Sequence, residues 1–424
     1  MVGKRQPADA TGRRWGARLG LLLLGLGCGV AAERGPPVLH WYVFREPSGA
    51  FAEAARRCSE DARGRYRIEI AALPADADQQ REQLVRRLAA RDPDIDVIGM
   101  DVMWTAEFAG AGWVRAWDEP GAERVRRGTL AAAVASGTFA GRLYAAPFTT
   151  NAQLLWYRRD LVPSPPGTWA AMIAAAEGLA DAGRPHRIEV QAARYEGLTV
   201  WFNTLLASAG GSVLDDAGAV ALPQAPTRRA LDVMRQLARS RAAPPDLATV
   251  REDEARLGFE SGRSAFMLNY TFVWPSAQRN APAIAANMAW APYPRTDPAR
   301  PSRVTIGGLN LGVGAFSRHA DLAVEAADCL RSDEHQVLAA RQGGLLPTRE
   351  VLYQHPEVRA AFPFAEVLRE TLRDATERPK TPAYYDVSLA IQRTLHPPRG
   401  IDPAADAELL RQRIEQATRS RGLL

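Results

Sequence analysis

The feature that most constrains the fold of this chain is an alternation of strand-like and helix-like patterns. Residues 38–44 and 66–72 predict strands, and residues 95–100 form a short apolar run bounded by acids, as in a buried strand. Between them, residues 51–63 and 78–91 keep apolar side chains at helical spacing. A β-α-β-α-β order predicts an α/β unit with a mainly parallel sheet.

The alternation restarts after residue 150, so one such unit does not account for the whole chain. Thr168 is the expected N-cap of a helix over 169–182, and Gly210-Gly211 ends a helix over 196–209. The sequence further predicts strands at 143–148, 186–191, 264–268 and 304–316, and helices at 105–110, 227–241, 252–261, 319–331 and over most of 356–424. A chain of 424 residues is also longer than one typical domain, so we expect two α/β units.

The N-terminal segment has the features of a targeting signal. Residues 1–18 are basic, and residues 19–30 form an apolar run of about a dozen residues, short for a bilayer span and typical of a signal peptide. Gly27 followed by Cys28 resembles a bacterial lipoprotein processing site, at which Cys28 becomes the lipid-bearing first residue. We therefore expect residues 1–27 to be removed and the protein to be anchored on the outer face of the cytoplasmic membrane. Secretion without an anchor and twin-arginine export through Arg13-Arg14 are the alternatives.

The net charge argues against a nucleic-acid partner once this leader is set aside. The whole chain carries +5, but residues 1–27 alone carry +4, from five basic and one acidic side chain. The rest of the chain is therefore nearly neutral and lacks the basic footprint that DNA or RNA binding requires.

Two cysteines remain in the exported part, Cys58 and Cys329, each on the apolar face of a predicted helix. They are either two separate buried thiols or a disulfide, and an oxidising compartment favours the disulfide. Such a bridge would close a loop of about 270 residues and stabilise the fold by up to about 5 kcal/mol in the chain-entropy model. Two cysteines without CxxC or a histidine at ligand spacing do not make a zinc site, so no metal is expected.

Catalytic and cofactor motifs are missing from the sequence. The six histidines never occur as HExxH, and neither a GxSxG elbow nor a Walker A loop is found. The glycines of residues 307–314 do not form GxGxxG and are interpreted as strand glycines that allow close backbone approach. We therefore expect no cofactor and no enzymatic activity, with a secreted glycosidase as an alternative because acid pairs abound in any such chain.

What remains resembles a known family over essentially all of the exported part. The stretches that carry the resemblance are residues 94–101 (DIDVIGMD), 104–113, 141–157 (GRLYAAPFTTNAQLLWY) and 259–270 (FESGRSAFMLNY). They are similar to bacterial extracellular solute-binding proteins of carbohydrate ABC importers, the maltose-binding-protein-like group. Residues 196–206, 304–311 and 378–382, with the two cysteines, most resemble the trehalose-binding lipoproteins of actinobacterial trehalose-recycling importers.

The resemblance implies a periplasmic-binding-protein (Venus-flytrap) fold, in which two α/β lobes are hinged by several chain crossings. The N-terminal lobe would comprise 28–148 and about 302–355, and the C-terminal lobe 149–301 and about 356–424. A monomer would bind trehalose or a related disaccharide between the lobes and deliver it to ABC permease subunits. Maltose or another α-glucoside is the alternative ligand, and an adhesin without transport function is a further alternative class.

The resemblance also implies the residues that would contact the sugar, namely Glu46, Gln80, Asp101, Asn151, Glu252, Tyr270, Gly308, Leu309 and Arg378. Carboxylates, amides and Arg suit sugar hydroxyls, and an aromatic ring covers a sugar face. Asp101 follows a predicted strand at its carboxyl edge, where α/β sheets place ligands. Glu254 competes with Glu252 for the position at the helix start. Tyr270 stands where the relatives carry Trp and would cover less of a sugar face.

Overall fold

A computed structural model describes residues 35–74, 77–215 and 217–419 of the chain. The expected signal peptide, residues 1–27, and Cys28 lie outside the described residues. From Pro36 onward the chain folds as one unit that contains two larger β-sheets. None of the helices in the described part is both long and apolar enough to cross a bilayer.

The first sheet has six strands in the order β12-β6-β11-β3-β1-β2. They are β1 (Val38–Phe44), β2 (Arg67–Leu73), β3 (Val97–Asp101), β6 (Ala145–Asn151), β11 (Gly307–Val313) and β12 (Leu346–Pro347). β1 pairs in parallel with β2 and β3, but β11 lies antiparallel between β3 and β6. The expectation of a mainly parallel sheet is therefore wrong for the half of the sheet that contains β11 and β6. The reason is that β11, a strand from far along the chain, inserts between β3 and β6.

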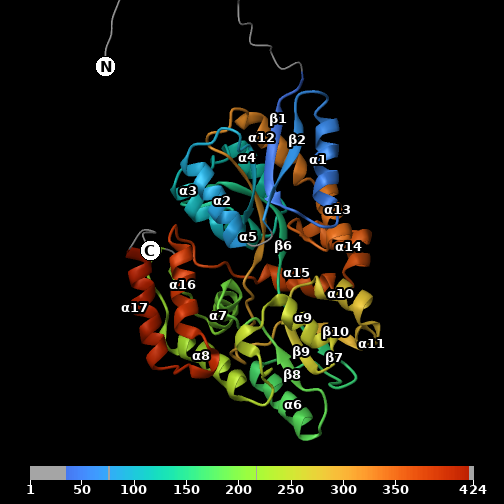
Figure 1. Ribbon diagram of the computed structural model, residues 1–424, viewed down its shortest axis with the longest axis vertical. Helices are drawn as coiled ribbons and strands as arrows, with labels where there is room; N and C mark the ends of the chain where they lie inside the picture. Colours follow the sequence, from blue (N-terminus) through green and yellow to red (C-terminus); the bar gives the residue numbers. More distant parts are fainter. Residues whose placement is uncertain (1–34, 75–76, 216, 420–424) are drawn as a thin grey trace, which may run out of the picture. The chain divides into compact units, whose positions relative to one another are not determined.

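Helices cover the two faces of this sheet (Figure 1). They are α1 (Ala50–Asp61), α12 (Ala320–Leu330) and α13 (Asp333–Gly343) on one face, and α2 (Ala77–Ala89), the 3-10 turn η1 (Val102–Trp104) and α3 (Thr105–Gly110) on the other. Trp41 and Val43 of β1 pack into the core beside α1, whereas Tyr42 packs into the core beside α2. This alternation is the period of two expected of a strand buried on both faces.

The second sheet has four strands in the order β10-β7-β9-β8. They are β7 (Leu154–Arg158), β8 (Arg187–Glu189), β9 (Ser264–Asn269) and β10 (Met288–Ala291). The main helices that share its hydrophobic core are α6 (Trp169–Asp181), α7 (Glu196–Ser208), α8 (Gln224–Arg239), α9 (Glu252–Glu260), α15 (Ala365–Arg373), α16 (Tyr384–Leu395) and α17 (Ala405–Arg419). The predicted N-cap is confirmed, since the backbone N–H of Ala171 donates to Thr168 Oγ1 at 3.1 Å.

Shorter elements complete the chain. They are α4 (Glu119–Arg126), α5 (Ala131–Ser136), the β4–β5 hairpin (Thr138–Phe139, Arg142–Leu143), η2 (Leu247–Thr249), α10 (Val273–Asn280), α11 (Pro282–Ala285), η3 (Glu350–Gln354), α14 (Pro356–Ala361) and η4 (Pro398–Gly400). The mostly helical character predicted for the C-terminal part is confirmed over 356–419.

The chain passes between the two sheets at several points, and these crossings position the site. β6 ends at Asn151 in the first sheet and β7 begins at Leu154 in the second. Just before β11, Thr305 forms a parallel bridge with Thr376, and the backbone N–H of Ile306 donates to the Thr376 carbonyl at 2.8 Å. The irregular segment 374–383 therefore runs beside the crossing that leads into β11.

A disulfide joins Cys58 of α1 to Cys329 of α12, 271 positions apart in the sequence. Both helices pack on the same face of the six-stranded sheet. His335 of α13 lies beside the bridge, with Nδ1 at 3.6 Å from Cys58 Sγ.

Candidate functional site

A cleft of about 480 Å³ lies where the six-stranded sheet, elements around the four-stranded sheet and segment 374–383 meet. Eight of the nine side chains or backbone positions proposed from the sequence line this cleft, namely Gln80, Asp101, Asn151, Glu252, Tyr270, Gly308, Leu309 and Arg378. They come from sequence positions 80 to 378, so only the folded chain assembles them. The cleft is the candidate ligand site.

Glu46 is the ninth, and the structure places it outside this cleft. Its carboxylate accepts backbone N–H groups of Ser48 at 2.7 Å and Ala50 at 2.9 Å, at the start of α1. A helix start leaves unpaired N–H groups that a nearby carboxylate satisfies. The structure thus gives the Glu46 carboxylate a role at the start of α1 and places it at a neighbouring surface hollow, and its contact with a sugar stays a prediction.

Asp101 lies where β3 gives way to η1, at the edge of the first sheet. Its Oδ1 accepts the backbone N–H of Met103 at 3.1 Å and Arg378 Nη2 at 2.9 Å. No described residue donates a hydrogen bond to Oδ2. Asp101 thus keeps one acceptor oxygen for a ligand hydroxyl, on a side chain that is still partly exposed.

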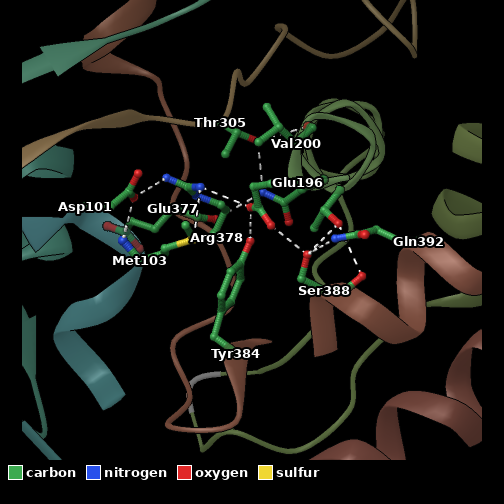
Figure 2. Close-up of polar contacts among 12 residues, drawn as sticks. Asp101, Met103, Glu196, Val200, Thr305, Glu377, Arg378, Tyr384, Ser388 and Gln392 are labelled. Atoms are coloured by element: carbon green, nitrogen blue, oxygen red, sulfur yellow. Dashed lines mark hydrogen bonds and ion pairs between the residues drawn. The ribbon is translucent and has the colours of Figure 1, made fainter. Parts of the chain in front are cut away.

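Arg378 lies between two carboxylates, as Figure 2 shows. Its Nη2 binds Asp101 and its Nη1 binds Glu196 Oε1 at 3.0 Å, while the side chain is only 7% exposed. Burial disfavours the charge on this guanidinium, but Asp101, Tyr384 and Glu196 together raise the pKa of Arg378. The side chain is therefore a fixed cation at any physiological pH.

Glu196 is a cleft residue that the sequence interpretation did not propose. It begins α7, and its carboxylate accepts from Arg378 Nη1, from the Tyr384 hydroxyl and from Ser388 Oγ at 2.6 Å. Burial raises the pKa of Glu196, although Arg378, Ser388 and Tyr384 all stabilise its charged form. Like Glu252, Glu196 stands at the start of a predicted helix, but the resemblance pointed to Glu252 alone of the two.

Glu252 and Glu254 at the start of α9 have different surroundings. Glu254 accepts the backbone N–H of Arg251 at 3.1 Å and so caps its own helix, whereas Glu252 lines the cleft. Burial raises the pKa of Glu252. Of the two rivals, Glu252 is thus the one available to a ligand.

Two tyrosines supply aromatic surface in the cleft. Tyr270 directly follows β9, and Tyr195 directly precedes α7, with the Arg251 guanidinium 4.7 Å from the Tyr195 ring centre. Burial raises the pKa of both phenols. Tyr195 was not singled out from the sequence, and it adds a second ring to the single platform expected there.

Asn151 and Gly308 meet at the paired ends of β6 and β11. Asn151 Oδ1 is buried without a hydrogen-bond partner among the described residues, which is costly unless a ligand or water satisfies it. Gly308 has φ +139°, and a Cβ there would lie 2.2 Å from the Thr149 carbonyl oxygen. This confirms the interpretation of these glycines as points of close backbone approach.

The chemistry of the cleft suits an uncharged polyhydroxylated ligand. Carboxylates, an amide and a guanidinium supply hydrogen-bond acceptors and donors, and two rings supply apolar faces. Among the described residues one cluster has the composition of a metal site, Cys58, Cys329 and His335, and its two sulfurs are bonded to each other.

Comparison with known proteins identifies relatives over most of the chain. Residues 66–337 match the family model described as "Bacterial extracellular solute-binding protein". A "Probable ABC transporter-binding protein" of Deinococcus radiodurans is 28% identical over 328 residues, which cover 74% of this chain and 76% of that protein.

Solved structures share the fold. Maltose-bound MalE3 of T. maritima superposes with a TM-score of 0.78 at 28% identity, covering 89% of this chain and 99% of that one. The GacH receptor of Streptomyces glaucescens, solved unliganded and with acarbose, gives a TM-score of 0.78 at 20% identity, covering 91% and 99%. The α/β architecture is therefore that of the two-lobed maltose-binding-protein-like class.

Proposed function

The chain belongs to the bacterial extracellular solute-binding protein family, and from that premise we propose that it binds trehalose or a related disaccharide for an ABC importer. The sugar would lie in the cleft, with Asp101, Asn151, Glu252 and Arg378 as hydroxyl partners and Tyr270 as the ring platform. The two sheets would be the centres of the two lobes, with the lobe boundaries expected from the sequence.

The observation that carries this proposal is the convergence of eight sequence-selected positions on one cleft of about 480 Å³. Two of the polar members have an acceptor that no described residue uses, Oδ2 of Asp101 and Oδ1 of Asn151. Charge-assisted hydrogen bonds in such a site contribute about 1.5–3 kcal/mol each.

Calorimetric titration of the purified protein against trehalose, maltose and other disaccharides tests the proposal. We expect binding of at least one of them, with trehalose the tightest. Tyr270→Trp should preserve or tighten binding because indole covers more of a sugar ring, and Tyr270→Ala should weaken it. Release of glucose during the titration would instead favour a glycosidase, and the absence of binding to every sugar would favour an adhesin.

Maltose is the second candidate ligand, and a specific comparison favours it. The solved relative at 28% identity was determined with maltose bound. If the protein binds maltose and shows no binding of trehalose, the proposed sugar-binding function is supported and the trehalose assignment is wrong.

The remaining parts of the proposal concern the cell envelope. Family membership implies an exported protein, and we propose a lipid anchor on Cys28 and delivery of the bound sugar to ABC permease subunits. The basic leader and the short apolar run that ends near Cys28 support the anchor.

A further inference from the structure

We propose that Glu196 is the positioning residue of the site: by binding Nη1 of Arg378, it limits the guanidinium to a one-nitrogen contact with Asp101, so that one Asp101 oxygen stays open for the sugar. This inference rests on the proposed function, because it assigns a role in ligand binding to a residue that resemblance did not bring forward. It is carried by the arrangement of three charged groups in Figure 2.

The first step concerns which carboxylate oxygens are free. Both oxygens of Glu196 accept hydrogen bonds from the protein, Oε1 from Arg378 and Tyr384 and Oε2 from Ser388. Asp101 uses only Oδ1, for Arg378 and the Met103 backbone. Of this pair of carboxylates, Asp101 is the one with an oxygen to which no described residue donates.

The second step concerns the guanidinium. Arg378 presents Nη1 to Glu196 and Nη2 to Asp101, and its buried Nε has no hydrogen-bond partner among the described residues. An arginine facing a single carboxylate prefers two parallel hydrogen bonds to it. Without Glu196, Arg378 would turn onto Asp101 as a two-point pair, and Asp101 Oδ2 would be lost to the sugar.

The third step is that Glu196 itself is held in place by other side chains. Ser388 Oγ, which donates to Glu196, is 2.8 Å from Thr199 Oγ1 and accepts from Gln392 Nε2 at 3.0 Å. These partners lie on α7 and α16, so the Glu196 carboxylate is fixed from two helices. A group fixed in this way can set the orientation of Arg378 before a ligand arrives.

Acid should weaken this arrangement, because protonated Glu196 is a poorer partner for a cation. The charged and titratable groups around Glu196 are Arg378 on segment 374–383, Tyr384 on α16, Asp101 at the end of β3 and Tyr270 after β9. Asp78, Arg81, Glu107 and Tyr385 line a small adjoining cavity. Since burial raises the pKa of Glu196, its protonation begins at a higher pH than that of an exposed glutamate.

The test is the pH dependence of sugar affinity in the full exported protein, measured by calorimetry with trehalose and with maltose. We expect the affinity of the parent protein to fall as the pH decreases from 7.5 toward 5. Glu196→Gln should weaken binding at least tenfold at neutral pH, and its affinity should change less over the same pH range. Tyr384→Phe, which removes one donor and no charge, should weaken binding only a few-fold.

Glu123→Gln is the matched control, since Glu123 is an exposed glutamate of α4 that does not line the cleft. It should leave affinity and its pH profile unchanged. If Glu196→Gln fails to fold, Glu196→Asp and Tyr384→Phe carry the test, and unchanged affinity in both overturns the inference. A folded Glu196→Gln that matches the parent at every pH also overturns it. A parent that binds no sugar of the panel overturns the proposed function first, which separates the two failures.

Discussion

At the scale of single residues, a few charged side chains make many of the polar contacts in the site. Arg378 is buried and contacts two carboxylates, Asp101 and Glu196. The two carboxylates differ in how many of their oxygens already accept a hydrogen bond from the protein. Removing one member of such a group leaves the others buried and unpaired, which costs more than the contact itself contributes. Substitutions at these positions should therefore have larger effects on binding than the number of lost contacts suggests.

Asp101→Ala should weaken sugar binding by at least tenfold, because Arg378 Nη2 and a sugar hydroxyl both lose their acceptor. Loss of one buried charged partner typically costs about 2–5 kcal/mol. Calorimetry measures the affinity, and thermal unfolding checks that the fold persists. Asp321→Ala is the control, since its carboxylate is 95% exposed and its ion pair with Arg115 is a surface one. A folded Asp101→Ala protein with parental affinity would show that the site lies elsewhere.

Glu189 gives a prediction about pH and stability that is independent of the site. It is 3% exposed, Ser264 Oγ donates to its Oε1 at 2.5 Å, and burial raises its pKa to about 7. The unfolded chain releases the Glu189 carboxyl proton near the ordinary glutamate pKa, whereas the folded chain keeps it up to about pH 7. Proton binding by Glu189 therefore stabilises the folded state. The stabilisation is full at pH 4, is lost as the pH rises toward 7, and amounts to about 3 kcal/mol.

Glu189→Gln removes this dependence because glutamine does not ionise. Urea unfolding should show the variant more stable than the parent at pH 8 and close to it at pH 4. The exposed Glu123→Gln is the matched control and should follow the parent at both values. Equal stabilities of parent and Glu189→Gln at pH 8 would contradict the prediction.

At the scale of elements, the sequence predicted five of the six strands of the first sheet, all but β12, and the parallel arrangement of β1, β2 and β3, but not the antiparallel insertion of β11. The period of two and the bounding acids located β1, β2 and β3, whereas the antiparallel insertion of β11 depends on contacts across more than 150 residues. β7 and β10 were not predicted, because short apolar runs without alternation do not distinguish a strand from a buried helix. Local pattern thus gives the elements, and tertiary packing gives their order.

The same division holds for the site residues. Asp101 and Asn151 could be predicted because they end strands, where ligands of α/β sheets bind. Arg378 lies on the irregular segment 374–383, where no periodicity marks it, and only resemblance brought it forward. Glu46 lies outside the cleft, because the start of α1, within four residues of it, satisfies its carboxylate. That competition is visible only when the start of α1 is placed in space.

The disulfide between α1 and α12 gives a prediction at this scale. Reduction should lower the free energy of unfolding by about 2–4 kcal/mol, because the bridge constrains a long loop of the unfolded chain. Sugar affinity should not change, since neither Cys58 nor Cys329 lines the cleft. Urea unfolding with and without reductant measures the first effect and calorimetry the second. In the Cys58→Ala, Cys329→Ala double variant, the reductant should have no effect; alkylation of both thiols in the untreated parent would contradict the bridge.

At the scale of the whole molecule, the cleft is a property of neither sheet alone. Asp101 and Gly308 come from the six-stranded sheet, Glu252 and Tyr270 from elements around the four-stranded sheet, and Arg378 contacts both sets through Asp101 and Glu196. A ligand bound there must touch both parts at once. In a two-lobed binding protein that geometry links ligand binding to the relation between the lobes.

The lipid anchor is the last prediction, and it concerns where this molecule works. A tether on Cys28 would confine the protein near the membrane and so raise its effective concentration at an importer. Cys28→Ala should therefore move the exported protein from the membrane fraction to the soluble fraction, as measured by fractionation and immunoblotting. Its sugar affinity should equal that of the parent, because all residues of the cleft lie between positions 44 and 378. A conservative change just after the leader, such as Ala31→Gly, should leave the partition unchanged. If Cys28→Ala remains with the membrane as the parent does, residues 1–27 act only as an export signal or a different anchor, and secretion without a lipid becomes the better account.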